Sequence, residues 1–207
     1  LVELLCDVAQ ASAEPVPYLE RAYATAKTMG DAAKLAEVAS IYFEALLTWD
    51  VDPARRAEAL VPVLQHLRNV HAAEPAAYLA ALERAARAVP SAQAQRWLLE
   101  AAALAADIYS DESARIAILQ RAADLPNPGE DVLDALAQAL ESTGRLPELF
   151  ALQRRSLSRC ESPQEAARLR LGGAGLVEKM DAEADVVEMR ESKLSVQPGD
   201  EASVDQV

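Results

Sequence analysis

The chain has 207 residues, of which 51% are hydrophobic and only 4% aromatic, and its formal net charge at pH 7 is −13. Ala and Leu supply most of the apolar residues, and both favour helices, whereas β-branched residues are sparse and no stretch alternates apolar and polar residues. We therefore expect no β-sheet. The acidic excess argues against nucleic acid and anionic membranes as partners, because both bind clustered Lys and Arg.

Features of targeting and redox chemistry predict a cytoplasmic protein. No run of the sequence reaches the ~20 apolar residues of a membrane span, and no signal peptide is visible. Cys6 and Cys160 lie far apart, and we interpret them as one buried and one incidental thiol in a reducing compartment. Because the chain begins at Leu1 rather than Met, we expect it to be a piece of a longer protein, whose own targeting signals it would not show.

Turn residues divide the chain into eleven predicted amphipathic helices. Gly30 is expected as a left-handed C-cap, and Asp31, Asp52, Asp111 and Asp181 as N-caps. Almost every connection has two to five residues, so consecutive helices should lie antiparallel. The predicted helices span residues 2–13, 16–29, 31–48, 53–72, 75–89, 91–109, 111–125, 130–143, 146–160, 163–179 and 181–194.

The turns recur at fixed distances, which is typical of a repeat protein. The segment Pro-Gly-Glu-Asp at 128–131 returns as Pro-Gly-Asp-Glu at 198–201, and Asp111 has its counterpart in Asp181 at the same offset of 70 residues. In a second register, apolar stripes that begin at a leucine each break eleven residues later at a turn residue; the pairs are Leu19 and Gly30, Leu79 and Pro90, and Leu133 and Gly144. In a stack of helix pairs, each pair buries its apolar face only against the next, so such repetition predicts a solenoid.

The best-defined copies resemble the tetratricopeptide repeat (TPR) family in its degenerate bacterial form. The family pattern has a large apolar residue, a leucine followed by a small residue, an aromatic or large residue, and a glycine at the turn. Residues that fill these places in order are Leu133, Leu136, Ala137, Leu140 and Gly144, and in a second copy Leu19, Ala22, Tyr23, Ala26 and Gly30. The resemblance implies an all-α fold, an α-α superhelix that winds as a right-handed solenoid of antiparallel helix pairs.

Some positions depart from the family pattern. Leu149 stands where the second helix usually has a small residue, and Pro90 stands where a turn glycine is usual. HEAT-type repeats are the alternative, since they also stack paired helices. We expect one helical-repeat domain over residues 1–207, with residues 195–207 as either a disordered tail or the start of a further repeat.

No pattern in the sequence points to catalysis, a cofactor or a metal site. His66 and His71 are five residues apart, which places them on different faces of a helix, unlike the i, i+4 pair that binds zinc. The glycine-rich segment 171–175 follows a helix rather than a strand, so we interpret it as a helix whose small residues let a neighbouring helix approach closely. We therefore expect neither an enzyme nor a cofactor-binding protein.

One segment runs against the acidic charge of the chain. Residues 145–170 hold six arginines and only three acidic residues, a local balance of +3; the arginines are Arg145, Arg154, Arg155, Arg159, Arg168 and Arg170. Two interpretations stay open at this point. The arginines pair with the acidic residues of the predicted helix 181–194, or they bind an acidic segment of a partner protein.

The leading functional hypothesis is a scaffold that binds a peptide, helix or domain of another protein on its repeat surface. Residues expected on that surface are Tyr18, Arg21, Tyr78, Arg84, Arg87, Gln138, Arg154, Arg155 and Arg159. Self-association through uncapped ends is a further expectation. The alternative is a ligand-sensing or regulatory domain of a larger multidomain protein, with a small molecule between helices and with Trp49 and Trp97 as candidate lining residues.

Overall fold

The computed structural model describes residues 1–159, 162, 164, 166–167 and 169–181, and all regular secondary structure among them is helical. The predicted all-α class is therefore confirmed. The helices are α1 (Val2–Ala11), α2 (Val16–Met29), α3 (Ala32–Thr48), α4 (Pro53–Val70), α5 (Pro75–Ala86), α6 (Ser91–Tyr109), α7 (Glu112–Ala123), α8 (Glu130–Ser142) and α9 (Leu146–Arg159). Further helical residues lie at 164, 166–167 and 169–181, and we refer to them as the last helical segment.

The predicted helix ranges agree with α1 to α9 to within three residues at each end. One expected boundary is wrong. Asp181 is helical and continues the last helical segment, so it does not open a new helix as an N-cap. The predictions for residues 182–194 and 195–207 lie outside the described residues.

The helix ends are fixed by local chemistry, as the turn residues indicate. The carboxylates of Asp31, Asp52 and Asp111 accept hydrogen bonds from backbone N–H groups of the following helix at 3.0, 3.3 and 2.8 Å, respectively. These bonds satisfy donors that have no partner inside the helix. Gly30 and Gly144 adopt the left-handed conformation with φ of 72° and 68°, which glycine enters without steric cost.

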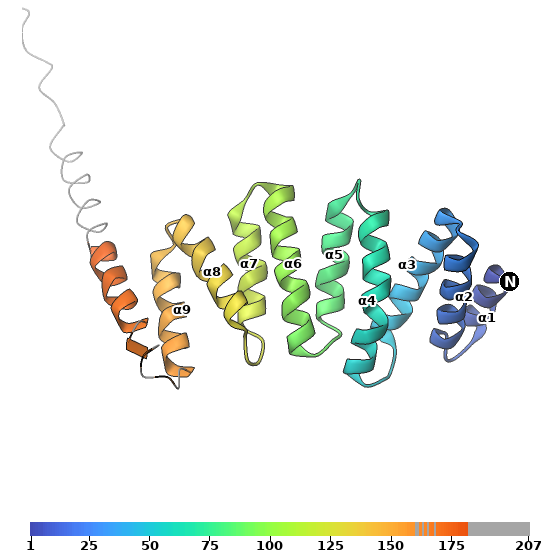
Figure 1. Ribbon diagram of the computed structural model, residues 1–207, viewed down its shortest axis with the longest axis horizontal. Helices are drawn as coiled ribbons and strands as arrows, with labels where there is room; N and C mark the ends of the chain where they lie inside the picture. The colour runs from blue at the N-terminus through green and yellow to red at the C-terminus, as the bar shows by residue number, and fades with distance from the viewer. Residues whose placement is uncertain (160–161, 163, 165, 168, 182–207) are drawn as a thin grey trace, which may run out of the picture. The chain divides into compact units, whose positions relative to one another are not determined.

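The chain divides into two compact units, residues 1–139 and 140–207. In the first unit, α1 to α7 lie side by side in chain order, and each helix packs against the one that follows it (Figure 1). Their connections are only two to four residues long, so neighbours run antiparallel. Among these consecutive pairs, α4 and α5 pack least extensively. The second unit contains the end of α8, α9 and the last helical segment.

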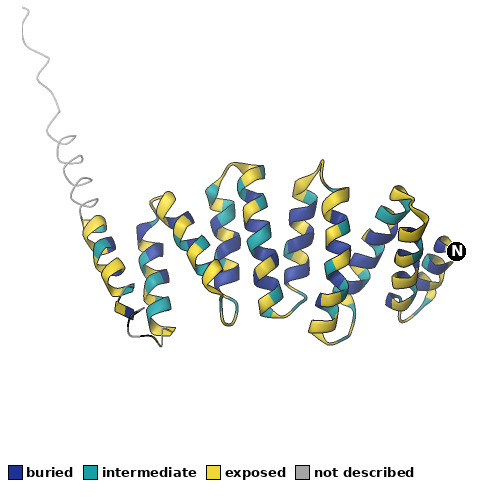
Figure 2. Ribbon diagram, viewed as in Figure 1, coloured by how far each residue is buried: buried dark blue, intermediate teal, exposed yellow. Residues whose placement is uncertain are grey.

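The apolar stripes of neighbouring helices form the core of the first unit. Each helix turns a buried stripe toward its neighbours and an exposed stripe toward solvent (Figure 2). The large side chains that are almost completely buried include Leu19, Leu46, Leu60, Leu82 and Ile116. Burial of one such side chain stabilises a fold by about 1.5–3 kcal/mol. The core is thus built from contacts between elements that are close in sequence.

A buried glutamine organises the loop between α7 and α8. Gln95 on α6 is only 7% exposed, and its Nε2 group donates to the carbonyls of Pro126 and Asn127 at 3.3 and 3.1 Å. Its Oε1 atom accepts the N–H of Gly129 at 3.0 Å. Gln95 thereby supplies partners for three backbone groups of the Pro-Gly turn that the sequence marks as recurrent. The second copy of that turn, at 198–201, lies outside the described residues.

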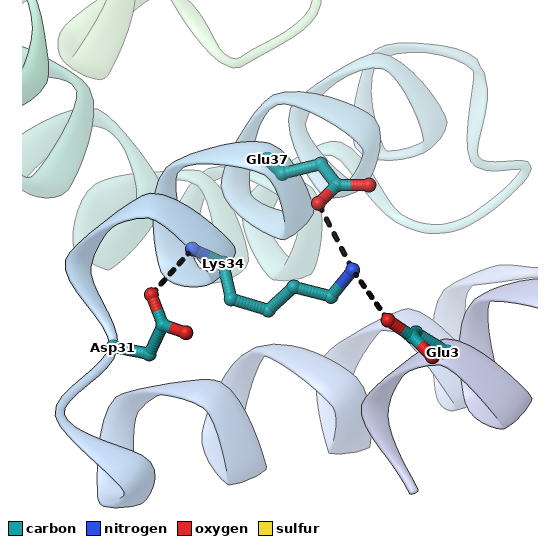
Figure 3. Close-up of polar contacts among 4 residues, drawn as sticks. All are labelled: Glu3, Asp31, Lys34 and Glu37. Carbon is teal, nitrogen blue, oxygen red and sulfur yellow. Dashed lines mark hydrogen bonds and ion pairs between the residues drawn. The ribbon is translucent and has the colours of Figure 1, made fainter.

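A lysine joins the first helix to the third. Lys34 on α3 places its Nζ atom 3.4 Å from an Oε of Glu3 on α1 and 3.0 Å from an Oε of Glu37 (Figure 3). Hydrogen bonds to the two glutamates raise the pKa of Lys34, with Glu37 the stronger partner. The nearby thiol of Cys6 is half-buried, and its burial raises its pKa, so the thiol stays protonated at neutral pH.

Substitution of Gln95 by Leu should lower the free energy of unfolding by about 2–4 kcal/mol, because it leaves buried carbonyl and N–H groups without partners at ~1–3 kcal/mol each. Urea denaturation followed by circular dichroism measures this change. Gln93→Leu on the same helix is the matched control, since Gln93 is half-exposed and has no such bonds; its effect should stay within ~0.5 kcal/mol. Equal stability of the two variants would show that Gln95 does not hold the loop.

Candidate binding site

An open apolar cavity of about 340 Å³ lies between α9 and the last helical segment. We call it the α9 groove. Its lining residues recur at helical spacing on both walls, so one face of each helix forms it. They are Phe150, Gln153, Arg154 and Leu157 from α9, and Leu169, Arg170, Gly173, Ala174 and Val177 from the opposite wall.

Two glycines of the last helical segment face side chains of α9. Gly173 is buried, and a Cβ atom added there would lie 3.6 Å from Cε2 of Phe150 and from Oε1 of Gln153. A Cβ at Gly172 would lie 3.4 Å from Nε2 of Gln153. The glycine-rich segment is helical, as expected, but a Cβ at either position would make only ordinary van der Waals contacts, so the approach of the two helices does not depend on these glycines. Gly175 has open space around it.

The α9 groove combines an apolar floor with positive charge. Arg154 and Arg170 are its only charged lining residues; both are exposed, and neither forms an ion pair within the described part of the chain. Oε1 of Gln153 is buried and finds no donor there either. The groove thus offers apolar contact and two cations.

The structure separates the arginines that the sequence groups together. Arg154 lines the α9 groove, Arg159 is exposed in the last turn of α9, and Arg155 is half-buried with a partner of its own. Arg145 is engaged locally, since its Nε donates to Glu148 at 2.6 Å. The remaining predicted member of this set, at position 168, lies outside the described residues.

The other predicted surface residues are not gathered into one site. Tyr78 is only 5% exposed and donates its hydroxyl to Glu100 at 3.0 Å, so the expectation that it is exposed is wrong. It belongs to the buried stripe of α5, which explains the difference. Arg84 is exposed but already bound to Glu44 through two contacts of 2.7 and 2.5 Å.

The four other predicted surface residues do not line the α9 groove. Arg21, Arg87 and Gln138 are exposed, and Tyr18 is half-exposed. None of them lines the cavity among α2, α3 and α4 either. Their role in binding stays a prediction.

A second cavity, of about 450 Å³, lies among α2, α3 and α4 in the first unit. We call it the α2–α4 groove. Two parallel helices form its walls, and α3 forms its floor. Its lining residues are Glu20, Tyr23, Ala24 and Lys27 on α2, Tyr42 and the C-cap residue Trp49 from α3, and Arg55, Glu58, Ala59 and Pro62 on α4.

Aromatic rings dominate the floor of the α2–α4 groove. The rings of Tyr23 and Tyr42 have centroids 5.8 Å apart, and the Tyr23 hydroxyl donates to the carbonyl of Pro62 at 3.2 Å. Burial raises the pKa of Tyr42 to about 12, with a smaller contribution from the carboxylate of Glu20. The guanidinium of Arg55 lies 5.3 Å from the centre of the Trp49 ring, a cation–π geometry.

The two tryptophans that the sequence offers as candidate lining residues differ in their surroundings. Trp49 lines the α2–α4 groove, whereas Trp97 is 6% exposed in the core and lines neither groove. The residues of α2 that line this groove were not predicted from the sequence. Glu20, Tyr23 and Lys27 follow the i, i+3, i+7 spacing of one helix face, which was the available signal.

No family model, curated protein or solved structure matches this chain. None of the described helices combines the length and the apolar character that crossing a membrane requires. Among the described residues, no three His, Cys, Asp or Glu side chains gather in a way that would hold a metal ion. Inference about function therefore rests on the two grooves.

His66 on α4 provides a test of the packing beside the α2–α4 groove. The centroids of the His66 and Tyr23 rings are 6.3 Å apart in an edge-on arrangement. The Nε2 atom of His66 is buried and has no hydrogen-bond partner among the described residues. Burial lowers the pKa of His66, and the positive charge of Lys27 lowers it further to a smaller extent. The folded chain therefore holds fewer protons at His66 than the unfolded chain does. Stability from this site is present above the ordinary pKa of 6.5 and is lost as the pH falls below it.

We expect His66→Asn to flatten the dependence of stability on pH. The wild-type chain should lose more free energy of unfolding between pH 7.5 and 5.5 than the variant, whatever the variant's absolute stability. Urea denaturation at several pH values in this range measures the difference, and carboxylate titration contributes to both proteins alike. An equal or steeper slope in the variant would rule out a buried neutral His66.

Proposed function

We propose that this chain is a protein-interaction scaffold of stacked antiparallel helix pairs, a TPR-like α-α superhelix, that binds an acidic, amphipathic helix of a partner protein in the α9 groove. The observation that carries the proposal is the groove itself. Among the described residues, its lining is apolar except for two arginines and a glutamine and includes no acidic side chain, although the chain as a whole carries a net charge of −13.

The packing of the first unit supports the repeat architecture. Helices α1 to α7 contact their sequence neighbours in chain order and are joined by short turns, which is how a stack of helix pairs buries its apolar faces. Capped turns at Asp31 and Asp111 and the left-handed Gly30 follow the expected repeat punctuation. A stack of this kind presents long helix faces to a partner.

The shape and charge of the α9 groove support a helical occupant. Two neighbouring helices present an apolar trough between them, and a third helix with a stripe of apolar side chains fits such a trough. Arg154 and Arg170 stand at its walls without ion-pair partners in the described residues, so acidic side chains that flank the apolar stripe would meet them.

The contribution of charge to binding is tested with two synthetic amphipathic helices. One carries a leucine stripe flanked by glutamates, and the other is identical except that lysines replace the glutamates. We expect Arg154→Glu combined with Arg170→Glu to weaken binding of the glutamate peptide by about tenfold or more, which corresponds to ~1.4 kcal/mol, and to improve binding of the lysine peptide. Isothermal titration calorimetry at low and at physiological salt measures both affinities.

Arg68→Glu combined with Arg96→Glu is the matched control, because it changes the net charge equally at exposed positions outside the groove. This control should bind the glutamate peptide as the wild-type chain does. If both double variants lose affinity to the same extent, the attraction is a general charge effect and not a property of the groove.

The contribution of apolar contacts to binding is tested by filling the α9 groove with a larger side chain. Ala174 is exposed and lines the α9 groove, so Ala174→Trp should block the trough and reduce peptide affinity by about tenfold, with little change in helix content. Ala151→Trp places the same side chain on an exposed position of α9 that does not line the groove and should bind normally. Fluorescence anisotropy of a labelled peptide measures both, and equal affinity of the two variants would exclude the groove as the site.

A further inference from the structure

The α2–α4 groove differs from the α9 groove in chemistry, and it lies in the other compact unit. Its volume of about 450 Å³ falls within the ~300–1,000 Å³ of typical small-molecule sites. Its walls contribute charged side chains and its floor contributes aromatic rings. This combination of an apolar, π-rich base with a few polar groups is common in sites for small ligands.

Hydrogen-bond acceptors line both walls of the α2–α4 groove. The carboxylates of Glu20 and Glu58 come from opposite walls, and neither is ion-paired within the described residues. Pro62 stands inside α4 and has no N–H group, so the carbonyl of Glu58, four residues earlier, lacks its usual helical donor. The hydroxyl of Tyr42 adds a further polar group, and the carboxylate of Glu20 is close enough to influence it. Acceptors without donors favour a ligand cation that donates hydrogen bonds.

Two cations flank this cluster of acceptors. Lys27 follows Glu20 by seven positions on α2, a distance of about 10 Å at 1.5 Å per residue. On the other wall, Arg55 lies one turn before Glu58 and covers Trp49. A ligand with positive charge alone would be repelled at both ends. A ligand with a cationic group and a carboxylate matches the whole arrangement.

We propose that the α2–α4 groove binds an amphoteric small molecule of amino-acid size that carries a carboxylate at one end and a guanidinium or ammonium group at the far end of its side chain. This side-chain cation lies between Glu20 and Glu58 and donates to their oxygens. The carboxylate pairs with Arg55 or Lys27 at one end of the groove. This site is independent of the partner-binding site proposed at α9.

Three molecules of nearly the same shape test separately whether binding requires the side-chain cation and the carboxylate. L-Arginine carries both charged groups, L-citrulline replaces the guanidinium by a neutral urea group, and agmatine lacks the carboxylate. Isothermal titration calorimetry with the full chain should give measurable binding for arginine and affinities at least tenfold weaker for citrulline and for agmatine. Binding of citrulline or agmatine as tight as that of arginine, or no binding of arginine at millimolar concentration, would overturn the proposal.

Variants place the binding in the groove. Glu20→Gln with Glu58→Gln should weaken arginine binding at least tenfold, whereas Glu14→Gln with Glu74→Gln, which removes the same charge at exposed positions outside the groove, should not. In a Trp97→Phe background, Trp49 is the only tryptophan and its fluorescence should change on arginine addition. Equal affinity of the two double variants would show that arginine binds elsewhere. The α9 variants Arg154→Glu and Arg170→Glu should leave this binding unchanged, so the two sites are tested separately.

Discussion

The fold depends on one constraint: a helix that is apolar over a wide arc cannot bury that arc by itself. In this chain, α3 buries Val38, Tyr42 and Leu46, and no single neighbour can cover all of them. Short capped turns bring the next helix back alongside, so that each helix is covered by the helices before and after it. The hydrophobic contacts that hold the first unit are therefore local in sequence. Buried polar groups are few and serve connections, as Gln95 does for the loop between α7 and α8.

Both proposed sites follow from the same constraint. Where α2 and α4 do not close over α3, a groove remains between them, although the Tyr42 side chain on its floor is buried. Where α9 and the last helical segment pack against each other, an apolar trough remains between them. What each groove can bind is then decided by the charges on its walls. One carries only arginines, and the other carries two acids and two cations.

The sequence predicts the helices better than it predicts the surfaces. Helix limits follow from residues that act locally, such as the Asp31 cap and the left-handed Gly30, and these are confirmed. Whether a residue on an amphipathic helix is exposed depends on the width of the buried stripe, which is set by the neighbouring helices. For this reason the prediction that Tyr78 is exposed was wrong. The pairing of Gln95 with a loop more than thirty residues away has no local signal at all. Arg154 was identified because charge contrast is visible in the sequence, but the apolar trough beside it is not.

The most direct test of the central claim is to map where an acidic amphipathic helix binds. Titration of the ¹⁵N-labelled chain with the glutamate-flanked leucine peptide, followed by ¹H–¹⁵N correlation spectra, reports each backbone amide separately. The proposed scaffold predicts that the largest shifts fall on residues 150–157 of α9 and on 169–177 of the last helical segment, and that they disappear in the Ala174→Trp variant. Shifts confined to the first unit, or an unchanged spectrum at saturating peptide, would contradict it.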